Sequence, residues 1–328
     1  MSTALIILII IVIAYDYING MNDSGNIVAT MVSSRSMTLG SALLMAAVFE
    51  FLGPFVVGTA VAKTIGNGLF DPSVINLKIL YAGVLGAITW NLITQIFGFP
   101  SSSSHALLGG IIGAVSISSG IDKIHTEGVL KILVVLFTSP LLGFAITFIV
   151  MKVLFLATDN TTPKINKVLK FMQIPSSIFL AISHGGNDAQ KSMGIIVIGL
   201  LTCGMQNTFS VPLWVVFFCS FALAMGILTG GVRIMKTLGS KIFKVSPIHG
   251  FGIQFSSALV IFAAALVGGP VSTTHVVSSS IVGAGSSTGL SKVRWGVVTD
   301  IIISWFLTLP CSAGIAIGVY YAIIYLKL

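Results

Sequence analysis

The chain has 328 residues, of which 55% are apolar and only 8% are charged, and its mean hydropathy is +1.05. Soluble globular domains carry about a quarter charged residues, so this composition excludes an ordinary soluble protein and indicates an integral membrane protein. The formal net charge is +8, but the basic residues lie between apolar runs and no basic patch carries interleaved aromatic residues, so nucleic-acid binding is not expected.

The apolar runs are long enough to form helices that cross a hydrocarbon core of about 30 Å. Two of the segments, 3–34 and 173–203, are interrupted by glycines and polar residues. We therefore predict an all-α membrane protein with discontinuous helices and about 10–12 membrane segments. In chain order the apolar runs fall at roughly 3–19, 27–34, 41–61, 77–98, 103–120, 130–152, 173–203, 211–231, 250–268, 271–286 and 295–326.

Three motifs occur twice, in the same order, which predicts two related halves. We expect a first repeat at 1–152, a linker at 153–171 and a second repeat at 172–328. The matched pairs are Gly20–Asn26 with Gly185–Lys191, Lys63–Gly66 with Lys236–Gly239, and Pro100–His105 with Pro270–His275.

Loop charge predicts the orientation. The linker 153–171 and the loop 232–246 carry several basic residues and few acids, so the positive-inside rule places both in the cytoplasm. In the segments 63–78 and 122–131 acids offset some or all of the basic charge, so both are expected outside. Equivalent loops on opposite sides predict an inverted repeat with an odd number of crossings per half. Three crossings plus a Ser/Thr-rich re-entrant hairpin, or five full crossings, would both satisfy this. The protein would then be a multi-pass protein of the cell membrane with an extracellular N-terminus.

The Asn-Asp motifs place two acids, Asp23 and Asp188, in apolar surroundings. A carboxylate there must be protonated, paired or bound to a cation, which is the physical basis for coupling transport to a sodium ion or a proton. The motif glycines would permit an unwound backbone whose carbonyls contact the ion. Glu50 lies in another apolar run and is a further candidate. The predicted coupling-ion residues are Asp23, Asn26, Asp188, Gln190 and Glu50, with sodium as a candidate ion at Asp23, Asn26 and Asp188.

The two Pro-Ser/Thr-His motifs are typical of helix N-termini, where hydroxyl groups and free backbone N–H groups bind anions. Two such termini could hold a tetrahedral oxyanion from opposite sides. Lys191 could either pair with Asp188 or contact the anion. The predicted anion ligands are Asn22, Ser101, Ser102, Ser103, Ser104, Asn187, Lys191, Ser272, Thr273 and Thr274.

Other polar residues in apolar runs are expected to serve structure. His105, His184 and His275 could relay protons, but bracing of helices is favoured. Asp16 and Asp300 lie near predicted helix ends and are interpreted as structural.

These motifs resemble those of the inorganic phosphate transporter family. The resemblance covers essentially the whole chain and includes the run Gly231, Arg233, Thr237 and Gly239. It implies symport of inorganic phosphate with sodium or protons by a homodimeric helical carrier without a cofactor, not an enzyme. Gln190 and Lys191 depart from the more widespread ending and resemble the bacterial low-affinity subgroup, for which a metal–phosphate substrate is also implied.

Three alternatives remain at this point. The same fold could carry sulfate or another oxyanion. A passive anion channel would not accumulate its ion against a gradient. An intramembrane hydrolase is disfavoured, because the adjacent Ser104 and His105 would point away from each other on a helix and no nucleophile elbow is present.

Overall fold

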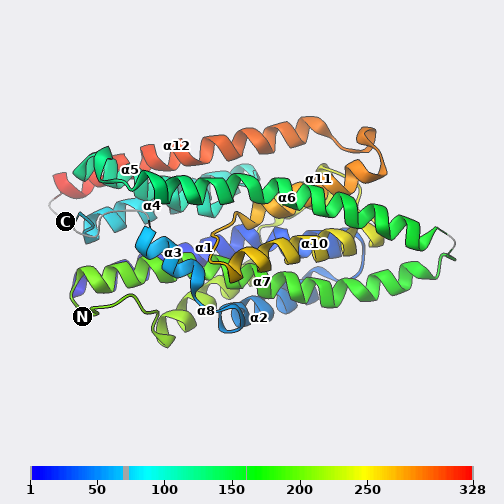
Figure 1. Cartoon of the computed structure of the whole chain (residues 1–328), viewed down its shortest axis with the longest axis horizontal. Coiled ribbons are helices and arrows are strands. Elements are labelled where there is room, and N and C mark those ends of the chain that lie inside the picture. Colours follow the sequence, from blue (N-terminus) through cyan, green and yellow to red (C-terminus); the bar gives the residue numbers. More distant parts are fainter. Residues whose placement is uncertain (1, 69–73, 160, 327–328) are drawn as a thin grey trace.

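The computed structural model describes residues 2–68, 74–159 and 161–326, which form a bundle of α-helices (Figure 1). The first half contains α1 (Thr3–Ser33), α2 (Leu39–Val57), α3 (Ala60–Gly68), α4 (Leu77–Phe97), α5 (Ser103–Ser119) and α6 (Thr126–Thr158). The second half contains α7 (Ile165–Thr202), α8 (Leu213–Thr229), α9 (Val232–Lys236), α10 (Pro247–Leu266), α11 (Thr273–Thr288) and α12 (Trp295–Tyr325).

Six of these helices are long and apolar enough to cross a membrane, namely α1, α2, α4, α6, α10 and α12. The count becomes seven if α8 and the segment 232–241, which meet at a 64° bend, form one span. This is fewer than the about 10–12 segments that the sequence suggests. The difference arises because α5 and α11 have only 17 and 16 residues, while the middle of α7 is too polar.

The predicted interruptions at 20–26 and 185–191 are wrong: α1 and α7 run through both motifs without a break. The motif glycines serve close helix contacts instead. A Cβ on Gly20 would stand 2.1 Å from the carbonyl oxygen of Leu223, and one on Gly185 would stand 2.3 Å from that of Glu50. Because the backbone carbonyls of an intact helix already accept the helical hydrogen bonds, the side chains are the main groups that these motifs offer to an ion.

Two pairs of consecutive helices are each joined by a short non-helical tip. We name them the first hairpin (α4 and α5, tip 98–102) and the second hairpin (α10 and α11, tip 267–272). As predicted, both Pro-Ser/Thr-His motifs contain a helix N-terminus: α5 begins at Ser103 and α11 at Thr273. The side chains of Ser102 and Ser272 accept hydrogen bonds from the backbone N–H groups of His105 and His275, so both serines are N-caps.

The predicted loops are largely helical. The linker 153–171 is reduced to a short connection, since α6 extends to Thr158 and α7 begins at Ile165. The segment 232–246 forms α9 and a π-helical turn, Thr237–Lys241. In Figure 1 both chain termini lie at one end of the bundle and the α6–α7 connection lies at the other.

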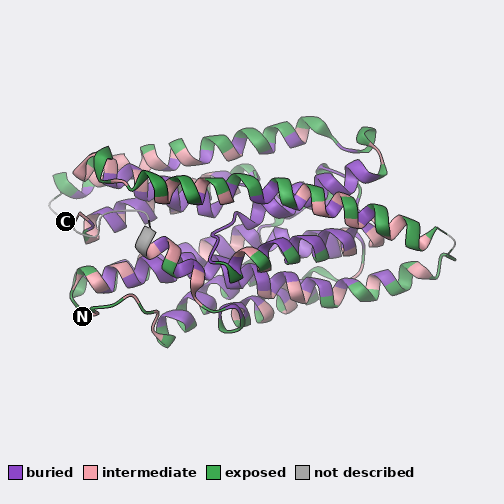
Figure 2. Ribbon diagram, viewed as in Figure 1, coloured by how far each residue is buried: buried purple, intermediate pink, exposed green. Residues whose placement is uncertain are grey.

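Burial follows the helix faces (Figure 2). Buried residues line the inward faces, whereas α6 and α12 expose long outer faces. The exposed side chains there are apolar, for example Leu141 and Leu156 on α6 and Phe306 on α12. An apolar exterior around a polar centre is typical of a protein in a lipid bilayer, because a charged group that faces the hydrocarbon is costly, whereas a group in the interior can find a partner.

Candidate functional site

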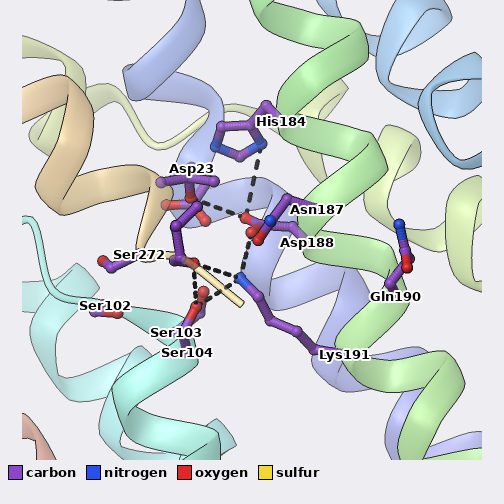
Figure 3. Close-up of polar contacts among 12 residues, drawn as sticks. Asp23, Ser102, Ser103, Ser104, His184, Asn187, Asp188, Gln190, Lys191 and Ser272 are labelled. Atoms are coloured by element: carbon purple, nitrogen blue, oxygen red, sulfur yellow. Dashed lines mark hydrogen bonds and ion pairs between the residues drawn. The ribbon is translucent and has the colours of Figure 1, made fainter. Parts of the chain in front are cut away.

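The middle turns of α1 and α7 meet the N-termini of α5 and α11 in the interior (Figure 3). The residues that form this meeting point are at most 7% exposed. Predicted anion ligands and predicted ion ligands, far apart in the sequence, therefore lie in one buried cluster.

The hydrogen-bond partners of Asp23 are neutral, although one carboxylate oxygen of Asp188 and one ring nitrogen of His184 lie within 4.8 Å of its carboxylate. The Thr274 hydroxyl donates to Asp23 Oδ1 at 2.8 Å, and Asn26 Nδ2 donates to the same oxygen at 2.7 Å and to Thr274 Oγ1 at 3.0 Å. Asp23 Oδ2 and Asn26 Oδ1 have no hydrogen-bond partner within the described ranges, and no basic nitrogen there lies within ion-pair distance of Asp23. Two buried oxygens are thus available for a cation.

Around Asp188 the neighbours are charged or ionisable. Lys191 Nζ lies 2.5 Å from Asp188 Oδ1, and the Thr273 hydroxyl donates to Asp188 Oδ2 at 3.1 Å. His184 Nδ1 lies 3.7 Å from Asp188 Oδ2 and 2.6 Å from Glu50 Oε1. Glu50, His184, Asp188 and Lys191 thus form a continuous line of acids alternating with nitrogen bases, all at most 1% exposed.

Lys191 also reaches both hairpins. Its ammonium group donates to Ser104 Oγ at 2.5 Å and to the Val271 carbonyl oxygen at 3.2 Å. Of the two roles that the sequence left open for Lys191, the structure shows the pairing with Asp188. The hydrogen-bond partners of its ammonium group among the described residues are all oxygen atoms.

Two motif asparagines contact the hairpins, one in α4 of the first hairpin and one at the tip of the second. Asn22 Nδ2 donates to the Asn91 carbonyl at 3.2 Å, and Asn187 Nδ2 donates to the Gly269 carbonyl at 3.0 Å. The Oδ1 atoms of both asparagines have no partner among the described residues. Each therefore keeps a buried acceptor oxygen beside the cluster.

The hydroxyl residues fall into different roles. Ser104, Thr273 and Thr274 contact the cluster directly, as described above. Ser102 and Ser272 cap helices, and Ser101 shares a 2.7 Å hydrogen bond with Thr94. The carbonyl of Ser103 accepts a hydrogen bond from the Tyr15 hydroxyl, so this contact does not use the Ser103 side chain.

Gln190 does not join the cluster, and Figure 3 shows it on the other side of α7. Its Oε1 accepts from the backbone N–H groups of Val61 and Ala62 at 2.8 and 3.2 Å, which lie in the first turn of α3. A helix turns by about 100° per residue. Lys191, three positions after Asp188, therefore faces the cluster, whereas Gln190, two positions after Asp188, faces away from it.

The histidines divide in the same way. The rings of His105 and His275 contact each other in a tilted arrangement with centroids 4.6 Å apart, and His275 stacks on Trp305. These two brace the hairpins, as favoured from sequence. His184 instead lies between two acids, and the favoured bracing role does not describe it.

Asp16 is not near a helix end: it lies within α1 and is fully buried. The Ser192 hydroxyl donates to its carboxylate. The expectation failed because it assumed that the first helix stops at residue 19. Asp300 is exposed near the start of α12, as expected of a residue with no part in the site.

The cluster has the donor set of a combined cation and anion site. One ligand atom from each of Asp23, His184 and Asp188 lies within 4.8 Å of the others. Hydroxyl groups and the N-termini of α5 and α11 reach the same space. Carboxylate and amide oxygens suit a hard cation, and helix N-termini suit an oxyanion.

Comparison with known proteins decides the family. The sequence profile of the Phosphate transporter family matches residues 19–316. The chain belongs to the phosphate transporter family. A "Probable low-affinity inorganic phosphate transporter" of Rhizobium meliloti (strain 1021) is 40% identical over 317 residues, covering 96% of this chain and 95% of that protein. A protein with the same name from Bacillus subtilis (strain 168) is 39% identical over 322 residues, covering 96% of each.

A solved structure described as "The sodium-dependent phosphate transporter" superposes on the whole chain with a TM-score of 0.92. Its sequence is 26% identical, and the match covers 100% of both chains. The phosphate transporter family is a family of membrane carriers, so the resemblance seen in the motifs is confirmed and an enzymatic role is not supported.

Sequence reasoning missed two partnerships in this member of the phosphate transporter family. Nothing in the chain order links Glu50 to His184, or Asp16 to Ser192. The only available signal was that each acid stands in an apolar run and needs a partner.

Proposed function

We propose that this chain transports inorganic phosphate together with a monovalent cation, sodium or a proton, across the cell membrane. The observation that carries the proposal is the buried meeting of two hydroxyl-bearing helix N-termini with Asp23, whose carboxylate has no cationic partner in the described residues. An anion alone would be repelled by Asp23, and a cation alone would leave the helix N-termini unused.

Coupling follows from this charge balance. A cation beside Asp23 Oδ2 and Asn26 Oδ1 would neutralise the carboxylate, after which a phosphate could bind at Ser103, Ser104 and the first turn of α11. In a low-dielectric site two opposite charges at about 4 Å attract far more strongly than in water, so each ligand raises the affinity for the other. Transport of either ligand alone is then disfavoured.

An inverted repeat would supply the alternating access. Contacts across the halves support it: Asp23 in the first half accepts from Thr274 of the second hairpin, and Lys191 in the second half donates to Ser104 of the first hairpin. In Figure 1 the hairpins lie toward opposite ends of the bundle. Three crossings and one hairpin per half fit this arrangement, with the end that holds the N-terminus extracellular and the α6–α7 connection cytoplasmic.

The two hairpin tips differ in access. A pocket of about 790 Å³ lies beside the tip of the second hairpin, and its lining includes Pro270 and the basic residues Lys63 and Lys131. At the tip of the first hairpin, Thr237 Oγ1 donates to the Gly98 carbonyl at 3.1 Å and the Arg233 guanidinium donates to Ile96. A smaller pocket of about 350 Å³ lies at this tip, lined by Ile96, Gly231 and Arg233 among others. We therefore interpret the structure as a state that is more open toward Lys63 than at Arg233.

The decisive experiment is uptake of labelled phosphate by proteoliposomes containing the purified protein, with an inward sodium gradient and an inward proton gradient imposed in turn. Accumulation above equilibrium with one of the gradients is expected, and Asp300→Asn serves as a matched control because that acid is exposed and outside the cluster. Equilibration without accumulation under both gradients would indicate a channel and contradict the proposal.

The same assay separates phosphate from sulfate. Unlabelled phosphate should compete with the labelled substrate, whereas sulfate should not. Stronger competition by sulfate would assign the site to another oxyanion.

A further inference from the structure

We infer that the ammonium group of Lys191 occupies, in the second half, the position that a coupling cation takes beside Asp23 in the first, so that the carrier binds one mobile cation at this pair of sites instead of two. This inference rests on the proposed function and specifies its coupling ratio.

Lys191 and Asn26 hold equivalent positions in the two halves. Asn26 and Lys191 each stand three residues after their aspartate and contact it, at 2.7 and 2.5 Å. Each also reaches a hydroxyl group of the opposite hairpin: Asn26 contacts Thr274 at 3.0 Å, and Lys191 contacts Ser104 at 2.5 Å. Thr274 and Ser104 themselves precede equivalent histidines. Both halves thus build the same bridge, once with an amide and once with a cation.

The surroundings of the ammonium group are those of a bound metal cation. Its contacts are a carboxylate oxygen of Asp188, the hydroxyl oxygen of Ser104 and the backbone carbonyl oxygen of Val271, at 2.5, 2.5 and 3.2 Å. Hard cations such as sodium take this mixture of carboxylate, hydroxyl and carbonyl oxygens. Lys191 is 1% exposed, so its charge lies inside the protein.

The charges around the two aspartates support the same inference. Asp188 has the tethered charge of Lys191 at 2.5 Å, while Asp23 has no basic nitrogen within ion-pair distance in the described residues. A second mobile cation at Asp188 would have to share the carboxylate with Lys191, and like charges at that separation repel strongly in a buried site.

The test replaces Lys191 with asparagine, the residue type at the equivalent position, Asn26, in the first half. Lys191→Asn restores the amide bridge and leaves Asp188 without its tethered charge, whereas the matched control Lys191→Met removes the charge without adding an oxygen. Sodium and phosphate uptake are measured together in proteoliposomes with two isotopes. For Lys191→Asn we expect sodium to be required, with one more sodium ion per phosphate than in the unmodified protein, and for Lys191→Met we expect no rescue by sodium.

Direct binding gives a readout that does not need transport. The melting temperature of purified Lys191→Asn should rise with sodium concentration more steeply than that of the unmodified protein or of Lys191→Met, because a new site stabilises the folded state by mass action. This measurement keeps the inference testable if the unmodified protein fails to transport phosphate, a result that would count against the proposed function alone.

Two outcomes would overturn the inference. An unchanged ion-to-phosphate ratio in Lys191→Asn, with weaker phosphate affinity in both variants, would make Lys191 an anion ligand. Equal behaviour of Lys191→Asn and Lys191→Met at every sodium concentration, in both assays, would show that no cation site lies beneath the lysine.

Discussion

Asp23 and Asp188 occupy corresponding places in α1 and α7, yet one has only neutral partners and the other stands in a line of charged groups. The packing around them is repeated: Gly20 contacts the backbone at Leu223 as Gly185 contacts the backbone at Glu50. The charges are not repeated, since the residue at this contact is Leu223 in one case and Glu50 in the other. Helix packing constrains size and shape, and it leaves the charge at each equivalent position free to differ.

The largest difference between the two aspartates should appear in transport by Asp23→Asn. Replacing this carboxylate leaves no buried charge unpaired, so the protein should keep its melting temperature. The apparent affinity for the coupling cation should fall by at least roughly 100-fold, the upper range for groups that merely orient a metal ligand. Uptake as a function of cation concentration measures this, and wild-type affinity would remove Asp23 from the ion site.

Asp188→Asn should act first on stability. It leaves Lys191 buried without its carboxylate, and breaking a buried ion pair from one side costs about 3–5 kcal/mol. Lys191→Met should show a similar loss for the opposite reason. Unfolding in detergent should give the double variant a smaller loss than the sum of the single ones. Additive losses would mean that the 2.5 Å contact contributes little.

Gly20→Ala and Gly185→Ala test the helix packing, which is similar around the two aspartates. Both added methyl groups would overlap a backbone oxygen of a neighbouring helix, at 2.1 and 2.3 Å. Each variant should lose about 1–3 kcal/mol of folding free energy, the usual range for overpacking. Melting curves of the two variants should shift by similar amounts, and a large shift in only one would show that the packing is not equivalent.

The smallest effect is expected for Gln190→Leu. This change removes the acceptor for two N–H groups of α3 and should cost about 1 kcal/mol, as for loss of a helix cap. The ion-to-phosphate ratio should remain unchanged because Gln190 faces away from the cluster. A changed ion-to-phosphate ratio would show that Gln190 belongs to the ion site, as predicted from the sequence.

The sequence by itself determined the membrane class, the duplicated motifs and the two helix starts at Ser102 and Ser272. These features depend on composition and on local patterns: apolar runs, a proline followed by hydroxyl residues, and repeated order. The same information identified Asp23, Asp188 and Lys191 as members of one site, since an acid or a base in an apolar run needs a partner.

Only the tertiary structure decided how those partners are distributed. Whether a glycine-rich motif unwinds depends on a neighbour: at Gly20 and Gly185 an adjoining helix fills the space, and the helices stay intact. Whether Glu50 pairs with His184, or Gln190 with α3, depends on which helices meet and on which faces. Such contacts join residues distant in the chain, so no local pattern encodes them, and they make the two aspartates unequal.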